Sequence, residues 1–206
     1  MIEKYVLEAK TEEELLPLAE EKLNTKENNL FYQIKEIESG KLFKSKKYQI
    51  EVYKKDDVVQ YIKKYIKELS QTMDLPIQTE ISIEDTNFQI QLYSENNAIL
   101  IGKEGRTMNA IQTMLKQAVQ NQIDYPLHIH VDVSNYRAKQ EHNFEYEIKK
   151  LMKEVQKTKI DMKLEPMNSY QRRIIHNLAP KFTNITTFST GEGKERYITI
   201  HYEEEK

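Results

Sequence analysis

Glycine is scarce in this chain, and the placement of two glycines constrains the fold more than any other feature. Only five glycines occur among the 206 residues. Two of them, Gly102 and Gly105, stand three positions apart, between the apolar segment 98–101 and an amphipathic segment that begins at Arg106. Because glycine has no Cβ atom, it permits a tight bend and lets another backbone approach closely. We therefore expect a sharp turn between two helices at residues 102–105.

Composition is typical of a folded protein and excludes several classes of function. Hydrophobic residues make up 38% of the chain and charged residues 31%, with both signs mixed. The absence of cysteine removes disulfides, thiol nucleophiles and thiolate zinc sites, and it fits a reducing compartment. The longest apolar run is the segment 98–101, too short to span a bilayer, and the first residues do not resemble a signal peptide. We expect a cytoplasmic protein.

The net charge of −2 conceals an uneven distribution along the chain. Residues 1–57 hold 11 basic and 13 acidic side chains, and residues 58–135 hold 6 and 9. Residues 136–202 hold 13 basic and 8 acidic side chains. A surface that binds phosphates must therefore be local, and the last third of the chain is the first place to expect one.

Periodicity divides the chain into three segments, which predict an α+β protein of three small domains in series. Residues 1–53 have a β-α-β-β pattern, with capping-box spacing between Thr11 and Glu14 at the start of the helix. The predicted strands of this segment cover 5–8, 30–37 and 48–53. A short linker at 54–57 follows, and residues 58–135 then have the order α-β-β-α-α-β.

The third segment, 136–206, predicts helices packed on a small three-stranded sheet. A long charged helix is expected to end near residue 158, and a short strand covers 161–164. Asn168 is a good N-cap, with Gln171 at the capping-box position of the next helix. A hairpin of two strands is expected to complete this segment, over 185–189 and 196–202.

The glycine pair has the form G-x-x-G, which by itself also occurs in plain tight turns. Placed between two helices within α-β-β-α-α-β, it resembles a KH domain of the bacterial, type II order. The loop of such a domain clamps the backbone of about four nucleotides. The resemblance therefore implies that five residues of this loop bind RNA: Gly102, Lys103, Glu104, Gly105 and Arg106.

A second motif combines an arginine and a histidine on one helical face. Arg172 and His176 are four residues apart, so both point to the same side of a helix. Spacing alone favours an exposed arginine and a histidine at a helix end. The surrounding sequence, Glu165-Pro-Met-Asn-Ser-Tyr-Gln-Arg-Arg-Ile-Ile-His, resembles the R-three-H domain, which implies a nucleic-acid contact. Arg173 and Lys181 are expected to add flanking charge.

A type II KH segment followed by an R-three-H segment resembles the Jag family of SpoIIIJ-associated proteins, also called the KhpB or EloR family. Residues 1–53 resemble its Jag-N domain. The resemblance implies a protein that binds single-stranded RNA, or single-stranded DNA, as an RNA chaperone or post-transcriptional regulator without enzymatic activity. It links the chain to cell elongation, cell shape and envelope biogenesis. It also implies a small single-KH partner protein and an association with the YidC-like membrane insertase.

Other interpretations of the residues stay open. A protein-interaction scaffold that uses the KH fold for docking is the main alternative, favoured by the weak overall charge and by Glu104. A basic loop lies between the second and third predicted strands and contains Lys41, Lys44, Lys46 and Lys47. We interpret it as a solvent-exposed loop or, alternatively, as a site that contacts a partner protein or a phosphate. No nucleotide-binding or hydrolase motif is present. We expect no cofactor and no metal.

Overall fold

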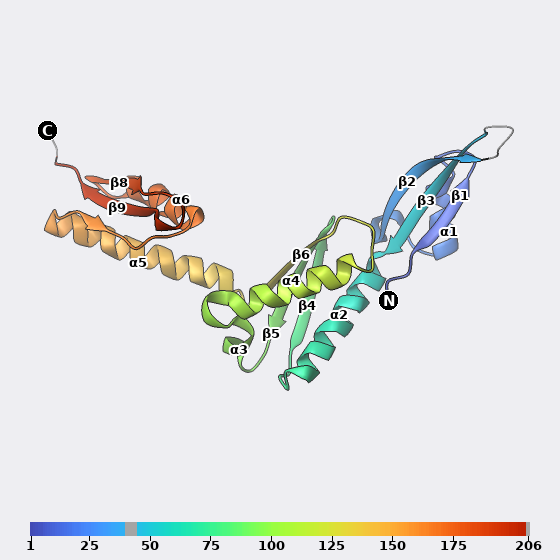
Figure 1. Ribbon diagram of the computed structural model, residues 1–206, viewed down its shortest axis with the longest axis horizontal. Helices are drawn as coiled ribbons and strands as arrows, with labels where there is room; N and C mark the ends of the chain where they lie inside the picture. The colour runs from blue at the N-terminus through green and yellow to red at the C-terminus, as the bar shows by residue number, and fades with distance from the viewer. Residues whose placement is uncertain (40–44, 205–206) are drawn as a thin grey trace. The chain divides into compact units, whose positions relative to one another are not determined.

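The computed structural model describes residues 1–39 and 45–204 (Figure 1). The chain divides into two compact units, Met1–Asn135 and Tyr136–Lys206. Each unit has its own small sheets and helices, so the α+β class is confirmed. The first unit combines the predicted Jag-N and KH segments, and their division into two separate domains stays a prediction.

The first unit begins with a three-stranded antiparallel sheet that one helix covers on one face. The strand order is β1-β3-β2. The elements are β1 (Tyr5–Ala9), α1 (Leu15–Leu23), a short 3-10 helix (Glu27–Asn29), β2 (Leu30–Ser39) and β3 (Ser45–Lys54). Tyr48, Ile50 and Val52 alternate on the face that packs against Leu15 and Ala19 of α1, as their spacing predicted. The predicted capping box of Thr11 and Glu14 is wrong, because Glu14 itself directly precedes the helix and makes no side-chain cap.

The chain passes from β3 into the next helix, α2 (Lys55–Thr72), without an intervening loop. The predicted linker at 54–57 is therefore wrong. Lys54 ends the strand, and Asp56 and Asp57 lie in the first turn of the helix. Carboxylates stabilise the positive end of a helix dipole, so residues that resemble a polar joint in the sequence form the start of α2.

The second part of the unit has the predicted α-β-β-α-α-β order. After α2 come β4 (Gln78–Glu84), β5 (Asn87–Tyr93), α3 (Asn97–Ile101), a 3-10 turn (Lys103–Gly105), α4 (Arg106–Gln120) and β6 (His128–Val133). The sheet order is β4-β5-β6, with β4 antiparallel and β6 parallel to β5. Buried side chains spaced at helical intervals, such as Ile62 on α2 and Leu115 on α4, form the core with Phe88 and Ile90 of β5.

Aromatic packing joins the two parts of this unit. The ring of Phe31 on β2 lies 5.9 Å from that of Phe88 and 5.2 Å from that of Tyr125, between ring centroids. The Tyr53 hydroxyl accepts a hydrogen bond from the backbone N–H of Asp124 at 3.2 Å. Tyr53, Phe31 and Phe88 are all buried. This joint therefore continues the core from one sheet to the next.

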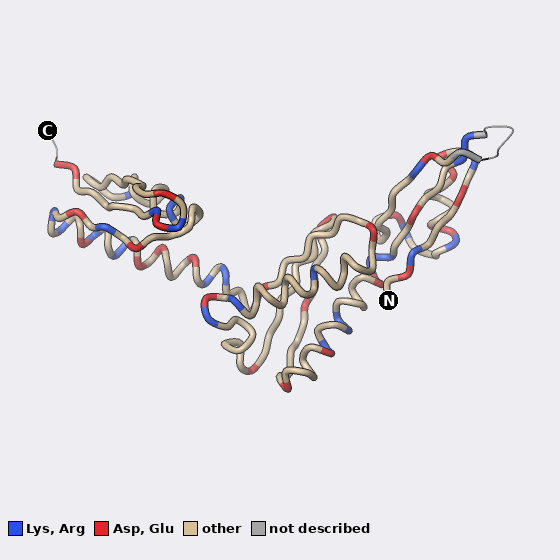
Figure 2. The backbone as a smooth tube through the Cα atoms, viewed as in Figure 1, with Lys and Arg blue, Asp and Glu red and all other residues tan. Residues whose placement is uncertain are grey.

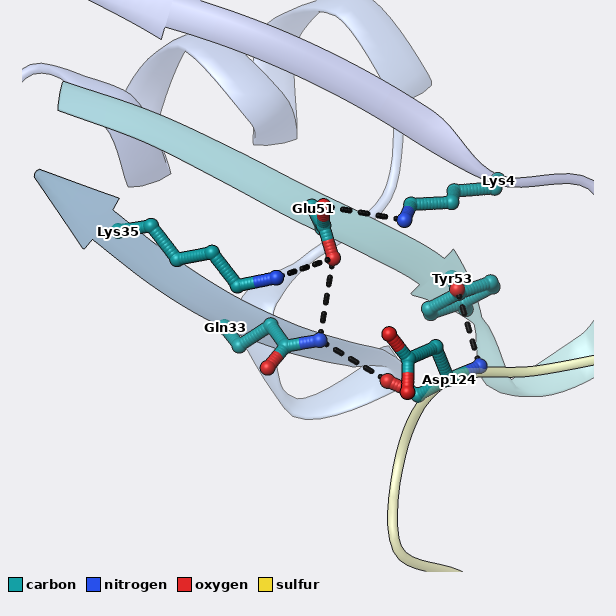
Figure 3. A network of polar contacts seen from close by, with 6 residues as sticks. All are labelled: Lys4, Gln33, Lys35, Glu51, Tyr53 and Asp124. Carbon is teal, nitrogen blue, oxygen red and sulfur yellow. Dashed lines mark hydrogen bonds and ion pairs between the residues drawn. The ribbon is translucent and has the colours of Figure 1, made fainter. Parts of the chain in front are cut away.

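A polar network lies beside this joint (Figure 3). Glu51 on β3 is only 7% exposed, and its oxygens pair with Lys4 at 3.0 Å and Lys35 at 3.1 Å. The Gln33 amide nitrogen donates to Glu51 at 3.1 Å and to the Asp124 carbonyl at 2.9 Å. The hydrogen bond from Lys4, with help from Lys35, lowers the pKa of Glu51 below its ordinary value. The buried carboxylate is thus satisfied on both sides.

The second unit packs two helices on one face of a small sheet, as predicted for the R-three-H segment (Figure 1). The strand order is β7-β9-β8, so β8 is an edge strand. The elements are α5 (Tyr136–Thr158), β7 (Met162–Lys163), α6 (Ser169–Leu178), β8 (Ile185–Thr190) and β9 (Tyr197–Tyr202), with 3-10 turns at Ala179–Lys181 and Gly193–Glu195. The predicted capping box of Asn168 and Gln171 is formed. Ile175 of α6 packs with Ile198 and Ile200 of β9 in the core.

Candidate nucleic-acid interface

The backbone of the turn between α3 and α4, here called the KH loop (residues 102–106), requires glycine. Gly102 has φ +67° and ψ −178°, a region that is essentially accessible only to glycine. A Cβ atom at Gly102 would lie 2.2 Å from the Oγ1 atom of Thr107. Glu104 and Gly105 are left-handed as well, with φ +56° and +79°. Few other sequences can form this bend, in which Gly102 is half-buried and Gly105 is buried.

The KH loop offers an anion both backbone and side-chain donors. Gly105 is the N-cap residue of α4 and has no side chain with which to cap it. The Arg106 N–H already donates to the Lys103 carbonyl, so the N–H groups that an acceptor could reach are those that follow it in the first turn. Lys103, Glu104 and Arg106 are all exposed, and Figure 2 shows basic and acidic positions together at this turn. Arg106 lies 3.7 Å from Glu104, so part of the basic charge is offset within the loop.

The helix before the loop presents an apolar surface and is firmly anchored. Ile99 of α3 is 49% exposed, whereas Leu100 is fully buried. The side-chain oxygen of Asn97 accepts from the Ser94 N–H at 2.9 Å, and its nitrogen donates to the Ser134 hydroxyl at 2.9 Å. Asn97 thereby ties α3 to the ends of β5 and β6. The position of Ile99 next to the loop is therefore fixed by the fold.

Arg172 and His176 lie one turn apart on α6, as predicted, and both are held by their own domain. The Arg172 guanidinium donates to the Met167 carbonyl at 2.7 Å. His176 Nδ1 lies 2.9 Å from the Thr187 hydroxyl on β8. His176 is nevertheless exposed. The side chains are oriented in advance and still accessible.

Sequence reasoning missed a third member of this face, Arg196. Its Nε donates to the Ser189 hydroxyl at 2.9 Å. The pKa of His176 is lowered from its ordinary 6.5, first by partial burial and then by the charges of Arg172 and Arg196. We name Arg172, His176 and Arg196 the β8 basic cluster. Its imidazole is predominantly neutral at pH 7, so the cluster combines two cations with an uncharged ring.

Arg173 and Lys181 belong to a different surface from Arg172 and His176. They line a pocket of about 270 Å³ between α5 and α6, together with Glu141, Glu145 and Tyr170. The pKa of Glu145 is lowered, chiefly by a hydrogen bond from Lys149 and further by nearby charges that include Lys181. The predicted R-three-H residues are thus divided between two sides of α6, and the charge of Arg173 and Lys181 faces carboxylates.

Two residues of the predicted basic loop, Lys46 and Lys47, belong to the described part of the chain. Lys41 and Lys44 lie outside the described residues. Lys46 pairs with Glu36 at 3.0 Å and Lys47 with Glu8 at 3.5 Å. The hydrogen bond to Glu36 raises the pKa of Lys46. Because the two lysines are consecutive on β3, they point to opposite faces of the sheet, and a single phosphate would not engage both.

The described residues contain no group of three His, Asp or Glu side chains that could hold a metal ion. Within the same residues, 1–39 and 45–204, no helix has both the length and the apolar character needed to cross a membrane. His201 lies on β9 of the second unit. Its Nδ1 lies 2.6 Å from the Asp161 carboxylate.

Comparison with known proteins supports both nucleic-acid motifs. Residues 59–133 match the family described as KhpA/KhpB, KH domain, and residues 145–202 match the R-three-H domain family. The RNA-binding protein KhpB of Bacillus subtilis (strain 168) is 30% identical over 165 residues, which is 78% of either chain. The RNA-binding protein KhpB of Clostridium symbiosum is 28% identical over 201 residues, 96% of this chain and 90% of that protein.

These matches cover the KH loop and the whole β8 basic cluster. They agree with the resemblance to the Jag family that the two motifs indicated. The chain belongs to the KhpB family.

Proposed function

We propose that this protein binds single-stranded RNA at two places, the KH loop and the β8 basic cluster, and acts by binding rather than by catalysis. The observation that carries the proposal is the backbone of the KH loop. Gly102 adopts a conformation essentially restricted to glycine, and the helix that follows begins with an uncapped N-terminus. Two relatives that match 78% and 96% of this chain are named RNA-binding proteins.

At the KH loop, main-chain N–H groups at the start of α4 would donate to phosphate oxygens, with Lys103 adding charge. Because Gly102, which is half-buried, has no Cβ atom, the sugar-phosphate backbone can lie directly against the protein backbone at that residue. Ile99, exposed at the adjoining helix, would contact the bases. This mode of binding depends more on the shape of the loop than on its net charge.

At the β8 basic cluster, side chains rather than backbone groups would bind the RNA. The guanidinium groups of Arg172 and Arg196 can each grip a phosphate through two parallel donors. His176 is predominantly neutral, so it would stack on a base or share a hydrogen bond rather than act as a cation. Arg173 and Lys181, which face carboxylates across the α5–α6 pocket, would contribute less.

The finer role follows the family resemblance. We infer that RNA binding serves an RNA chaperone or post-transcriptional regulator in the cytoplasm, connected with cell elongation, cell shape and envelope biogenesis. A small single-KH protein would be its partner, and an association with the YidC-like insertase would place part of its action near the membrane. Single-stranded DNA is a second ligand for the same surfaces.

A docking scaffold is the second candidate, and one observation favours it. Glu104 lies 3.7 Å from Arg106 and reduces the attraction of the loop for phosphate. A scaffold would show no RNA affinity to titrate with salt. An RNA-binding protein would show a linear fall of log affinity with log salt concentration.

The test combines Lys103→Asp with Glu104→Asp, which makes the loop acidic and retains both glycines. RNA affinity should fall at least about tenfold, or 1.4 kcal/mol, with an unchanged melting temperature. Lys116→Asp is the matched control, because it makes the same charge change on α4 ten residues from Arg106, about 15 Å along the helix. Unchanged affinity in the loop variant would remove the KH loop as an RNA site.

A further inference from the structure

We propose that the solvent face of the R-three-H sheet is a stacking platform for the bases of single-stranded RNA, with Phe188 at its centre. The proposal rests on the proposed RNA-binding function and adds a binding surface to it. This face lies opposite the one covered by α5 and α6. It carries no residue that the sequence motifs singled out.

The register of the sheet determines which side chains share this face. Antiparallel partners point to the same side, and three pairs lie on the solvent face: Thr186 with His201, Phe188 with Thr199, and Thr190 with Tyr197. The intervening pairs, Thr187 with Ile200 and Ser189 with Ile198, lie on the helix-covered face, where Ile198 and Ile200 are fully buried. Three aromatic rings therefore stand on one open surface.

Phe188 is the most exposed of these rings. It is 57% exposed although it occupies a regular strand position. Its centroid lies 5.8 Å from that of His201, with the two planes tilted by 57°. Exposed rings on a small antiparallel sheet are sequence-tolerant platforms, since every base has a π-face that can stack on them.

The His201 ring is held in a fixed orientation. Its Nδ1 lies 2.6 Å from one oxygen of Asp161, and the other oxygen of Asp161 accepts from the Tyr202 N–H at 3.1 Å. Both donors lower the pKa of the Asp161 carboxyl. A ring fixed in advance loses little conformational entropy when a base stacks on it.

A lysine side chain lies over the third ring, that of Tyr197. The Lys163 ammonium group on β7 lies 4.1 Å from the centroid of Tyr197. Lys163 and Tyr197 also line a groove of about 440 Å³ beside the sheet, whose lining includes Glu165 and Glu195. A cation placed over an aromatic ring provides both a phosphate contact and a stacking surface.

Two observations favour nucleic acid over a protein partner on this face. Between the rings stand the hydroxyl groups of two threonines, Thr190 and Thr199, whereas the Thr186 hydroxyl on the same face is buried. The centre of a protein interface is mostly apolar, whereas bases require stacking surfaces and hydrogen-bond donors together. The second observation is continuity, because Thr187 and Ser189 of the same edge strand hold His176 and Arg196. A strand of RNA crossing β8 would meet the β8 basic cluster and Phe188 in succession.

The experiment compares Phe188→Thr with Phe188→Tyr in the full chain. Threonine already occurs on this face and suits a strand, while tyrosine keeps the ring. The probes are a short labelled single-stranded RNA and an abasic oligomer of the same length. Phe188→Thr should weaken binding of the RNA about tenfold and leave binding of the abasic oligomer and the salt slope unchanged. Phe188→Tyr should bind as the wild type does.

Tyr146→Ala is the matched control, because Tyr146 is 68% exposed on α5 and belongs to none of the three proposed surfaces. It should bind RNA as the wild type does. Wild-type affinity in a folded Phe188→Thr variant would overturn the platform and leave this face to a protein partner. An equal loss on the abasic oligomer would overturn it too. If the KH loop variant weakens binding and Phe188→Thr does not, the proposed function stands without this surface; if the wild type binds no RNA, both fail.

Discussion

Replacing Gly102 by alanine should destabilise the first unit severely for two reasons, backbone strain and a steric clash. The residue adopts φ +67° and ψ −178°, where a side chain costs about 1–3 kcal/mol of backbone strain. The new Cβ atom would also meet Thr107, at 2.2 Å from Oγ1, 2.9 Å from Cβ and 3.0 Å from the backbone nitrogen. A rotation of the threonine can move only the first of these atoms.

The two effects together should cost about 2–6 kcal/mol, since overpacking of this kind adds about 1–3 kcal/mol to the strain. Gly193→Ala is the matched control. Gly193 also has a positive φ, +55°, but a Cβ atom there would have nothing within 4 Å. Only the left-handed backbone would be penalised, at about 1–2 kcal/mol.

Urea unfolding followed by hydrogen exchange and mass spectrometry measures both variants, because peptides from each unit report the stability of that unit separately. Thr107→Ala introduced into the Gly102→Ala chain should recover part of the loss by removing Oγ1, and the cycle isolates the clash. If Gly102→Ala costs no more than Gly193→Ala, then Thr107 does not oppose a side chain at this position. The argument that only glycine fits the KH loop would then be refuted.

Three further predictions concern charge and capping. Glu51→Gln should lower the free energy of unfolding of the first unit by about 1–2 kcal/mol at pH 7. Folding lowers the pKa of Glu51 from 4.5. Urea unfolding should therefore show the difference between variant and wild type above pH 4.5, and this difference should disappear as the pH falls below that value. His176 has a folded pKa below 6.5, so its contribution to the second unit is present above pH 6.5 and lost on acidification, and His176→Gln should flatten that part of the stability–pH curve. Asn168→Ala should cost about 1 kcal/mol through the lost capping box, and a melting temperature equal to wild type would contradict it.

Local patterns in the sequence predicted local structure well. The alternation of Tyr48, Ile50 and Val52 placed one face of β3 in the core, and the spacing of Asn168 and Gln171 predicted the start of α6. Such patterns report residues that are neighbours within one strand or one helical turn. Two predictions at helix starts were wrong, the capping box at Glu14 and the linker that included Lys55. Both errors arose because a polar residue can cap a helix, begin it or precede it.

Contacts between distant parts of the chain could not be predicted from these patterns. Phe31 gave no sign that it packs on Phe88 and Tyr125, and nothing local related Arg196 to His176. Each of these pairs joins different elements, and the spacing of residues in a single sequence does not indicate which elements pack against each other. For that reason the joint in the first unit and the β8 basic cluster emerged only from the structure.

The acceptors of the basic side chains explain how a chain of net charge −2 can attract RNA locally. Lys46 and Arg106 lie beside carboxylates of their own unit, at 3.0 and 3.7 Å. Arg172 and Arg196 instead donate to a backbone carbonyl and a serine hydroxyl, which orient the guanidinium groups without neutralising them. Their charge therefore stays available to phosphate. It follows that salt should weaken binding at the β8 basic cluster more steeply than at the KH loop, where the backbone provides the main donors.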